Sequence, residues 1–245
     1  MPEWKIHTYT SLPSTQDYVK ELVAEGLEEG IVVQSMEQRH GRGRHGRTWH
    51  SPIGNLYMSV LLRPTCDVKE AGQLAFIAAN AVSGAIDEII DKKHTKTLKW
   101  PNDILINGQK ACGILIEKEA GGYALGMGVN IIAPPEGAVG LNSVTWDIQV
   151  PIHPFRDKVL AHLSSFYDEW QQNGFAKNRE QWLKNAHGLN KPIKTKRGKE
   201  DIAGIFRGLG VDGALQIEVE DGTLLDINAG EVYFPAINNK NGDET

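Results

Sequence analysis

A long apolar segment with helical spacing constrains the fold of this chain more than any other feature. Residues 71–90 are largely apolar and rich in small side chains, namely Ala75, Ala78, Ala79, Ala81, Ser83, Gly84 and Ala85. A helix of this composition belongs in a core, and its small residues allow close packing against a sheet. We therefore expect a core helix that packs on β-strands.

Strand-like segments flank this helix on both sides. They are short apolar or alternating runs at residues 4–9, 31–33, 55–62, 98–106, 113–117 and 123–131. Asn107-Gly108 suits a tight hairpin turn with positive φ. The last three runs are therefore predicted to form one meander.

Two more helices and a change of pattern are predicted along the rest of the chain. Ser14 offers a side-chain oxygen to cap a helix that ends near Gly26, and residues 153–172 predict an amphipathic helix. From Ile193 onward, short strands alternate with glycine or aspartate turns, at residues 202–207, 214–219, 224–227 and 232–234. A small β domain is therefore expected to begin near residues 189–192.

Composition and charge exclude several classes of function. A chain of 245 residues is long enough for one full core and a small second domain, and its net charge of −5 argues against a general nucleic-acid binder. No run approaches the about 18 apolar residues of a membrane helix, and the N-terminus lacks a signal pattern. We therefore expect a cytoplasmic protein without a membrane partner.

The cysteines and histidines do not predict a structural metal. Cys66 and Cys112 lie far apart without a Cys or His neighbour at metal-ligand spacing, and the eight histidines are scattered. We expect both cysteines to be small buried apolar residues.

The segment from Gly41 to Trp49, here called the arginine loop, is the main candidate for ligand binding. Its sequence, GRGRHGRTW, combines three arginines with three glycines in nine residues of an acidic chain. Glycine lets a backbone approach a ligand closely, and arginine provides paired donors for phosphate or carboxylate. The loop is therefore predicted to bind an anion.

Two other interpretations of this loop are weaker. A G-x-G-x-x-G pattern is also found in dinucleotide-binding turns, but there it opens a helix, whereas here a strand follows. A solvated charged loop is the second alternative, and it would leave Trp49 in water. Trp49 could instead pack on an adenine ring while Arg42, Arg44 and Arg47 hold negative oxygens.

A second set of polar residues lies around the predicted hairpin. Asn102 and Asp103 either form a turn or recognise a nucleotide and help to hold magnesium, which prefers oxygen ligands. Lys110 is either an exposed hairpin lysine or a point charge at the mouth of an apolar site, where it would stabilise a carboxylate that attacks phosphorus. The residues alone leave these alternatives open.

Together these segments resemble the biotin protein ligases. The likeness rests on Ser14-Thr15-Gln16, Gln38, the arginine loop, NLYMSVLLRP, KWPNDILINGQKACGILIE and GMGVNI, which occur in the family's order. The resemblance implies an α+β catalytic domain of the biotin-lipoate ligase type, like that of class II aminoacyl-tRNA synthetases. This domain would have a mixed, mostly antiparallel sheet with flanking helices over residues 1–189. It also implies an SH3-like β barrel over residues 190–237, followed by a polar tail over 238–245.

The resemblance further implies the activity of a biotin–[acetyl-CoA-carboxylase] ligase. Such an enzyme would join biotin and ATP, with Mg²⁺, into biotinyl-5′-AMP and pyrophosphate, and then transfer biotin to a lysine of a biotin carboxyl carrier protein. Arg44 and Lys110 are the implied catalytic residues. The implied biotin contacts are Ser14, Thr15, Gln16, Gln38, Arg42, Gly43, Arg44, Lys110 and Gly113. The implied ATP and adenylate contacts are Arg44, Arg47, Trp49, Asn102, Asp103, Lys110 and Asn130, with Asp103 as the magnesium ligand.

The chain departs from the family pattern at three points. It reaches Ser14 without room for the helix-turn-helix domain that many members carry, so specific DNA binding is not expected. Gln16 stands where asparagine is frequent, and His45 stands where arginine is frequent. Two rival functions remain: a lipoate or octanoate ligase or transferase of the same superfamily, and a nucleic-acid-binding module. Whether the protein is a monomer or a homodimer is left open.

Overall fold

The chain folds into two compact units. The computed structural model describes residues 2–26, 28–146, 149–197, 200–228 and 230–234. One unit comprises Met1–His187 and the other Gly188–Thr245. The expected polar tail, residues 238–245, lies outside the described residues.

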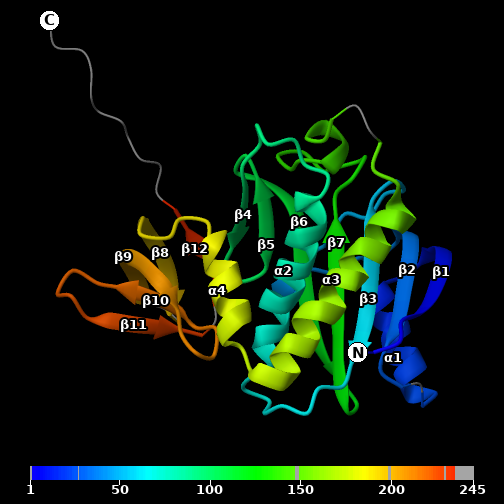
Figure 1. The fold of residues 1–245 in the computed structure, drawn as a ribbon, viewed down its shortest axis with the longest axis horizontal. Coiled ribbons are helices and arrows are strands. Elements are labelled where there is room, and N and C mark those ends of the chain that lie inside the picture. The colour runs from blue at the N-terminus through cyan, green and yellow to red at the C-terminus, as the bar shows by residue number, and fades with distance from the viewer. Residues whose placement is uncertain (1, 27, 147–148, 198–199, 229, 235–245) are drawn as a thin grey trace, which may run out of the picture. The chain divides into compact units, whose positions relative to one another are not determined.

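The first unit is built on a mixed sheet that is almost entirely antiparallel (Figure 1). The strand order among the described residues is β1-β2-β3-β7-β6-β5-β4, and only β1 and β2 are parallel. The strands are β1 (Lys5–Leu12), β2 (Ile31–Gln38), β3 (Leu56–Leu62), β4 (Lys96–Lys99), β5 (Asp103–Ile106), β6 (Gln109–Glu119) and β7 (Gly122–Val129). The predicted meander is confirmed, because β5, β6 and β7 are consecutive neighbours and Asn107 and Gly108 both have positive φ at the turn. Its first run, residues 98–106, is not one strand as expected, because a turn at residues 100–102 separates β4 from β5.

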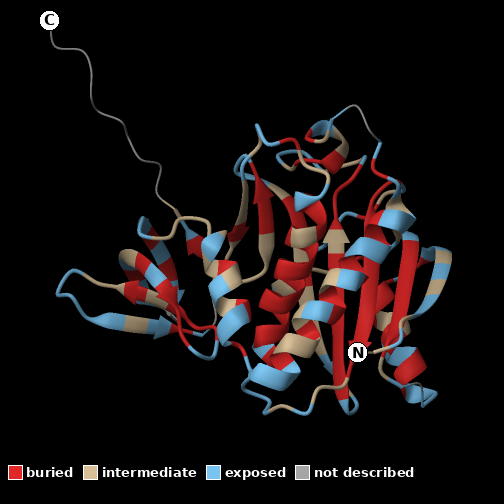
Figure 2. Ribbon diagram, viewed as in Figure 1, coloured by how far each residue is buried: buried red, intermediate tan, exposed pale blue. Residues whose placement is uncertain are grey.

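The predicted core helix packs on this sheet. It is α2 (Leu74–Asp87), shorter than predicted because a 3-10 turn (Ala71–Gln73) precedes it, and almost all of its residues are buried. Figure 1 shows α2 and α3 (Ile152–Asn173) side by side across one face of the sheet, and Figure 2 shows that the strands behind them are buried along most of their length. Helix α4 (Ala176–Lys184) was not predicted, because its polar sequence shows only Trp182 as a large buried side chain.

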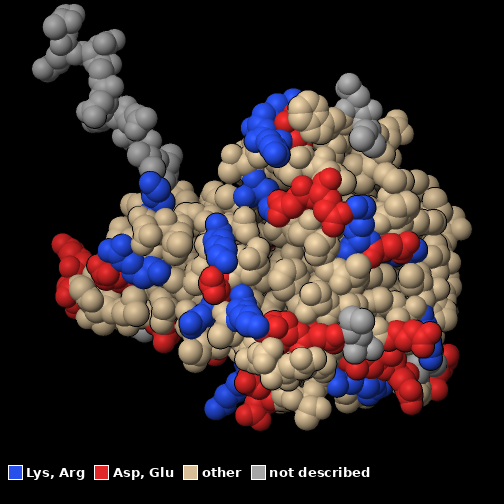
Figure 3. All heavy atoms as spheres, viewed as in Figure 1, with Lys and Arg blue, Asp and Glu red and all other residues tan. Residues whose placement is uncertain are grey.

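Charged side chains of both signs are interspersed on the surface. On the face drawn in Figure 3, lysine and arginine lie next to aspartate and glutamate, without a broad basic patch. No helix in the described part of the chain is both long and apolar enough to cross a membrane.

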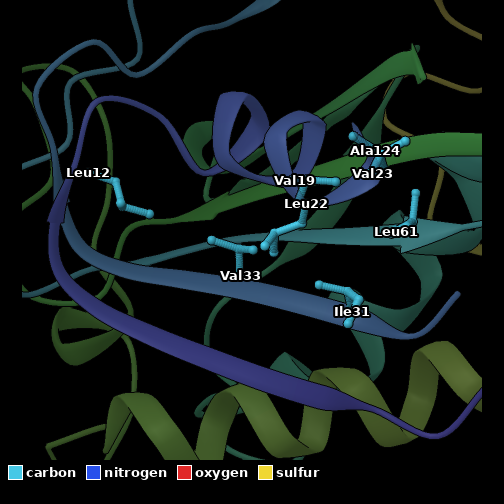
Figure 4. Packing of buried hydrophobic residues seen from close by; sticks show 8 residues of the cluster. All are labelled: Leu12, Val19, Leu22, Val23, Ile31, Val33, Leu61 and Ala124. Carbon is cyan, nitrogen blue, oxygen red and sulfur yellow. The ribbon is translucent and has the colours of Figure 1, made fainter. Parts of the chain in front are cut away.

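Helix α1 (Thr15–Ala24) packs on the opposite face of the sheet (Figure 4). Its Val19, Leu22 and Val23 contact Val33 of β2, Leu61 of β3 and Ala124 of β7 in a small buried cluster. Alternate residues of a strand share a face, so Ser35, Ser59, Gly126 and Gly128 lie on the same face as this cluster. Thr15 and Gln16, at the start of α1, reach Ser59 and Gly126 of this area.

The second unit is an antiparallel sheet. Its strands are β8 (Pro192–Arg197), β9 (Glu200–Leu209), β10 (Leu215–Glu218), β11 (Leu224–Ile227) and β12 (Val232–Tyr233), in the order β11-β10-β9-β8-β12. Phe206, Leu215, Ile217 and Ile227 are almost fully buried and form its interior. Strand β8 was missed, because Lys194, Lys196 and Arg197 make its sequence strongly basic.

Candidate functional site

Three positions without side chains form a flat area on the sheet beside α1. Gly126 and Gly128 alternate along β7, and Gly113 of β6 lies opposite Gly128 in the pairing register. A Cβ atom at Gly128 would lie 2.6 Å from the indole of Trp49, and one at Gly113 would lie 2.7 Å from it. A Cβ atom at Gly126 would lie 3.1 Å from the Gln16 side chain. These three glycines, here called the glycine face, make room for Trp49 and Gln16.

A cation beside Trp49 is paired with a carboxylate. The Lys110 Nζ lies 5.1 Å from the centroid of the Trp49 ring and 2.7 Å from the Asp103 Oδ1. Asp103 lies opposite Gly113 in the register, so the ion pair borders the glycine face. Ring and ammonium are close enough for a cation–π interaction.

Arg44 brings a second cation to this place. Its Nη1 lies 3.5 Å from the Asn102 Oδ1. Burial lowers the pKa of Arg44, and the nearby charge of Asp103 partly opposes this effect. Because arginine stays protonated in proteins, the result is a poorly solvated positive charge that gains energy from an anion. Asn102 itself is fixed by its Nδ2, which donates to the Ile114 carbonyl at 2.6 Å.

A chain of polar contacts joins α1, β2 and the end of the arginine loop. The Gln38 Oε1 accepts from the Thr15 N–H at 2.8 Å and from the Thr15 Oγ1 at 3.1 Å. The Gln38 Nε2 donates to the Ser51 Oγ at 3.0 Å, and this hydroxyl donates to the Trp49 carbonyl at 2.9 Å. Ser59 is within 2.7 Å of the Thr15 hydroxyl. This chain fixes Thr15 and Gln38 at one end of the site.

Ser14 does not cap α1 as predicted. It occupies the N-cap position, but its side chain makes no capping hydrogen bond, and the Gln38 Oε1 accepts the Thr15 N–H instead. The Ser14 hydroxyl is buried and has no hydrogen-bond partner among the described residues. The same holds for the Gln16 Oε1, the Trp49 Nε1 and the Asn130 Oδ1. Buried polar groups without partners are costly, so four such atoms in one site indicate a polar ligand.

The glycines of the arginine loop have different local roles. Gly46 has a φ of 73°, and a Cβ atom at Gly41 would lie 2.5 Å from the Trp49 carbonyl. A Cβ atom at Gly43 would make only ordinary contacts, at 3.5 Å or more. The backbone conformation and packing therefore do not require Gly43, which leaves its open side available to a ligand.

Arg42 and Arg47 occupy different surroundings from Arg44. The Arg42 guanidinium forms ion pairs with Asp17 and Glu117. Burial acts to lower the pKa of Arg42, but the hydrogen bonds to these two carboxylates raise it above its ordinary value. Arg47 is exposed, and its carbonyl accepts from the Gly43 N–H at 2.7 Å.

Asn55 holds a segment that borders the site, and this role was not predicted from the sequence. It is buried, and its Oδ1 accepts from the backbone N–H groups of Ile131, Ile132 and Ala133 at 2.8, 3.1 and 3.1 Å. Its Nδ2 donates to the Tyr57 hydroxyl at 3.0 Å. The segment that it holds directly follows Asn130. A polar residue immediately before the apolar strand 56–62 was the available signal.

The described residues contain no cluster of three histidine, cysteine, aspartate or glutamate side chains that could hold a metal ion. Asp103 is the one carboxylate beside Lys110 in the contacts described above. A single carboxylate suits a magnesium ion that arrives on phosphate oxygens and keeps its waters, not a dedicated protein cage. Cys112 is buried as expected, whereas Cys66 is partly exposed.

The structure brings most of the candidate residues to one face of one sheet. Trp49, Lys110, Asp103, Arg44, Asn102 and Gly113 lie at one end, and Thr15 and Gln38 lie with Ser51 and Ser59 at the other. Ser51 and Ser59 were not predicted, although Ser59 interrupts an apolar strand. The site combines buried polar atoms with an aromatic ring and two cations, of which Lys110 lies beside the ring and Arg44 beside Asn102.

Family models match both units. The biotin/lipoate A/B protein ligase family matches residues 9–132, and the biotin protein ligase C-terminal domain matches residues 188–234. A biotin–[acetyl-CoA-carboxylase] ligase of Paracoccus denitrificans is 35% identical over 86% of this chain and 93% of its own length. A bifunctional ligase/repressor of Bacillus subtilis is 31% identical over 86% of this chain and 68% of its own length.

Solved structures show the same fold. The biotin protein ligase of Aquifex aeolicus in complex with biotin and ATP is 28% identical, with a TM-score of 0.82 over 94% of this chain and 97% of its own. The biotin protein ligase of Leishmania major in complex with biotinyl-5-AMP is 26% identical, with a TM-score of 0.67 over 92% of this chain and 99% of its own. The predicted α+β class, with its mixed and mostly antiparallel sheet, is thereby confirmed.

Proposed function

Because the chain belongs to the biotin/lipoate A/B protein ligase family, we propose that it activates biotin with ATP and transfers it to a protein lysine. The observation that carries this proposal is a pair of cations near Asp103, with Lys110 beside the Trp49 ring and Arg44 beside Asn102, together with buried polar atoms that have no partner among the described residues. In the first step a biotin carboxylate oxygen attacks the α-phosphorus of ATP, and the bond to pyrophosphate breaks. In the second step the lysine amine takes the biotinyl group and AMP leaves.

The physical obstacle to the first step is repulsion between two anions. Arg44 and Lys110 would neutralise charge as the carboxylate approaches the phosphate, and fixed cations need no reorganisation at that moment. Asp103 holds the Lys110 ammonium at 2.7 Å, which would position it for the reacting oxygens. We therefore assign catalysis to Arg44 and Lys110.

The two ends of the site suit the two ligands. At the α1 end, the Ser14 hydroxyl and the Gln16 Oε1 are unpaired, and Thr15 and Gln38 lie beside them, which suits the ureido donors and acceptor of biotin. Gly43 and Gly113 would border the bound biotin, and Arg42 would lie beside it. At the other end, Trp49, Asn102 and Asn130 suit an adenylate, with Arg47 at the rim. Mg²⁺ would be held by Asp103 and phosphate oxygens and would further neutralise the phosphate charge.

Biotin-dependent exchange of labelled pyrophosphate into ATP tests this proposal. We expect exchange with biotin and none without it, and a loss of at least about 100-fold in Arg44→Ala, the magnitude typical of a lost transition-state donor. Arg179→Ala, on α4, is the matched surface control. Absence of biotin-dependent exchange in the folded wild-type protein would contradict the proposed reaction.

Two rival functions give different results in the same assays. A lipoate or octanoate ligase would support exchange with those acids, which lack a ureido group to pair with the Gln16 and Ser14 acceptors. A nucleic-acid module would bind nucleic acid with an affinity that falls steeply with salt and would need no biotin. The net charge of −5 does not favour that module.

The remaining assignments are also part of the proposal. The carrier would be a biotin carboxyl carrier domain, and the ligase would act in the cytoplasm as a monomer or homodimer without specific DNA binding. The catalytic domain would comprise residues 1–189, and residues 190–237 would form the SH3-like domain. Mass spectrometry of a carrier domain incubated with biotin, ATP and the protein tests the transfer, since biotinylation adds a defined mass to one lysine.

A further inference from the structure

Arg42 differs from the other arginines of the loop because its guanidinium contacts two carboxylates. The Nη1 lies 2.6 Å from the Asp17 Oδ1, and the Nη2 lies 2.9 Å from the Glu117 Oε2. Asp17 belongs to the first turn of α1, and Glu117 belongs to β6. One loop residue therefore bridges two elements that border the site.

The two carboxylates are held independently of the loop. Helix α1 is fixed by Val19 and Leu22 in the buried cluster, and Glu117 is paired with Ala124 in the register of β6 and β7. Both carboxylates approach one guanidinium, so they would repel each other without it. The framework thus presents a preformed site for one cation, and the chain supplies Arg42.

Other contacts at the tip of the loop are weaker or local. The Arg44 Nη1 lies 3.5 Å from the Asn102 Oδ1, and the hydrogen bond from Gly43 to Arg47 stays inside the loop. Arg42 also forms the bridge with Thr48 that closes the loop on itself. The ion pairs of Arg42 therefore add a charged connection between the closed loop and the first unit, besides the packing of Trp49 against the glycine face.

We propose that Arg42 is a positioning residue whose ion pairs with Asp17 and Glu117 hold the arginine loop over the glycine face. The loop then keeps Arg44 beside the reacting groups and retains the adenylate until the carrier lysine attacks. This role rests on the proposed function. It gives the Arg42 side chain a task other than direct contact with biotin.

Three variants separate this role from direct ligand binding. Arg42→Gln removes the cation, Asp17→Asn with Glu117→Gln removes the two anions, and Arg42→Lys keeps a charge that reaches one carboxylate at a time. Arg207→Gln is the matched control, because Arg207 is a half-exposed arginine held by Glu218 in the second unit.

The first measurement is trypsin cleavage after Arg44 and Arg47 in the ligand-free protein, which does not depend on activity. We expect about fivefold faster cleavage in Arg42→Gln and in the Asp17→Asn/Glu117→Gln variant. The effect is modest because partly exposed ion pairs stabilise the closed loop only slightly. The cleavage rate of Arg42→Lys should lie between the rates of these variants and that of the wild type. Arg42→Gln leaves two facing carboxylates and should lower the unfolding midpoint slightly, whereas Asp17→Asn with Glu117→Gln removes both charges and should keep the wild-type midpoint.

The second measurement is the half-life of labelled biotinyl-AMP on the purified enzyme. We expect it to shorten about fivefold in both variants, with no further change when they are combined, because each removes the same interaction. Effects that multiply on combination, or unchanged cleavage in Asp17→Asn/Glu117→Gln, would overturn the proposal. If the wild type formed no biotinyl-AMP, the proposed function would fail, while the cleavage rates would still decide the role of Arg42.

Discussion

The site of this protein depends on a few single residues, namely one aromatic side chain, one lysine and the glycines that make room for the aromatic ring. The indole of Trp49 lies where Cβ atoms of residues 113 and 128 would be, and the Lys110 ammonium lies above the ring. A base that stacks on an aromatic side chain gains ~1–3 kcal/mol. Under the proposed function, the two glycines would therefore contribute to nucleotide binding through Trp49.

Gly128→Ala should weaken ATP binding selectively. The new Cβ atom would lie 2.6 Å from the indole, so Trp49 must move. We expect the KM for ATP in pyrophosphate exchange to rise about tenfold, within the stacking energy above, with little change in biotin affinity. Gly72→Ala is the control, because its Cβ atom would meet nothing within 4 Å. An unchanged KM for ATP would show that the position of Trp49 does not matter.

His187 should make the stability of the first unit depend on pH. Burial lowers the pKa of His187 below its ordinary value of 6.5, and the charge of Lys99 adds to this effect. The unfolded chain therefore binds the proton more readily, so stability is complete above about pH 6.5 and falls as the pH drops through the folded-state pKa. In urea denaturation from pH 5 to 7.5, His187→Gln should lose less stability on acidification than the wild type. Parallel curves would contradict this.

At the scale of elements, the site depends on the connections between strands. Asn55 precedes β3, yet its side-chain oxygen, Oδ1, accepts hydrogen bonds from the three backbone N–H groups that follow Asn130 after β7. The Tyr57 hydroxyl donates to the Pro52 carbonyl at 2.8 Å and accepts a hydrogen bond from the Asn55 side chain. The segment after Trp49 therefore belongs to the same hydrogen-bond network. Two loops of the site thus share one buried amide.

Asn55→Ala should cost ~2–4 kcal/mol of unfolding free energy, because it leaves buried N–H groups without an acceptor. It should also raise the KM for ATP more than the KM for biotin, since Asn130 loses its support. Asn55→Asp keeps an acceptor for the three N–H groups and should recover part of both losses. Denaturation curves and exchange kinetics on the same preparations provide the check. Equal rises in both KM values would argue for a purely structural role.

At the scale of the whole molecule, each unit has its own buried interior. Leu61 is fully buried in the first unit and Phe206 is 1% exposed in the second. All six tryptophans of the chain lie within residues 1–187. Tryptophan fluorescence therefore reports the unfolding of one unit, while far-ultraviolet circular dichroism reports both.

Phe206→Ala should destabilise the second unit by ~3–5 kcal/mol and leave the fluorescence midpoint of the first unit unchanged. Leu61→Ala is the reciprocal variant, and it should lower that midpoint through a loss of ~2–5 kcal/mol. Guanidinium titrations followed by both signals distinguish the two. A fluorescence midpoint that falls in Phe206→Ala would mean that the units unfold together.

Much of the molecule could be predicted from the sequence, within limits that have physical causes. The apolar helix and the hairpin at Asn107-Gly108 were predicted because burial and positive φ leave strong local patterns. The predicted Ser14 cap was wrong, because the Ser14 hydroxyl makes no capping hydrogen bond, while Gln38, distant in sequence, accepts from the Thr15 N–H. The contacts of Asn55 and of Arg42 are tertiary, and no local pattern records which segments they join.

The glycine face also limits how the site can change over evolutionary time. Residues 113, 126 and 128 have no side chain beyond hydrogen, so every substitution there adds atoms against Trp49 or Gln16. Drift at these positions can therefore narrow the range of acceptable ligands but cannot widen it. A related enzyme that accepts bulkier acids would have to change other residues of the site instead.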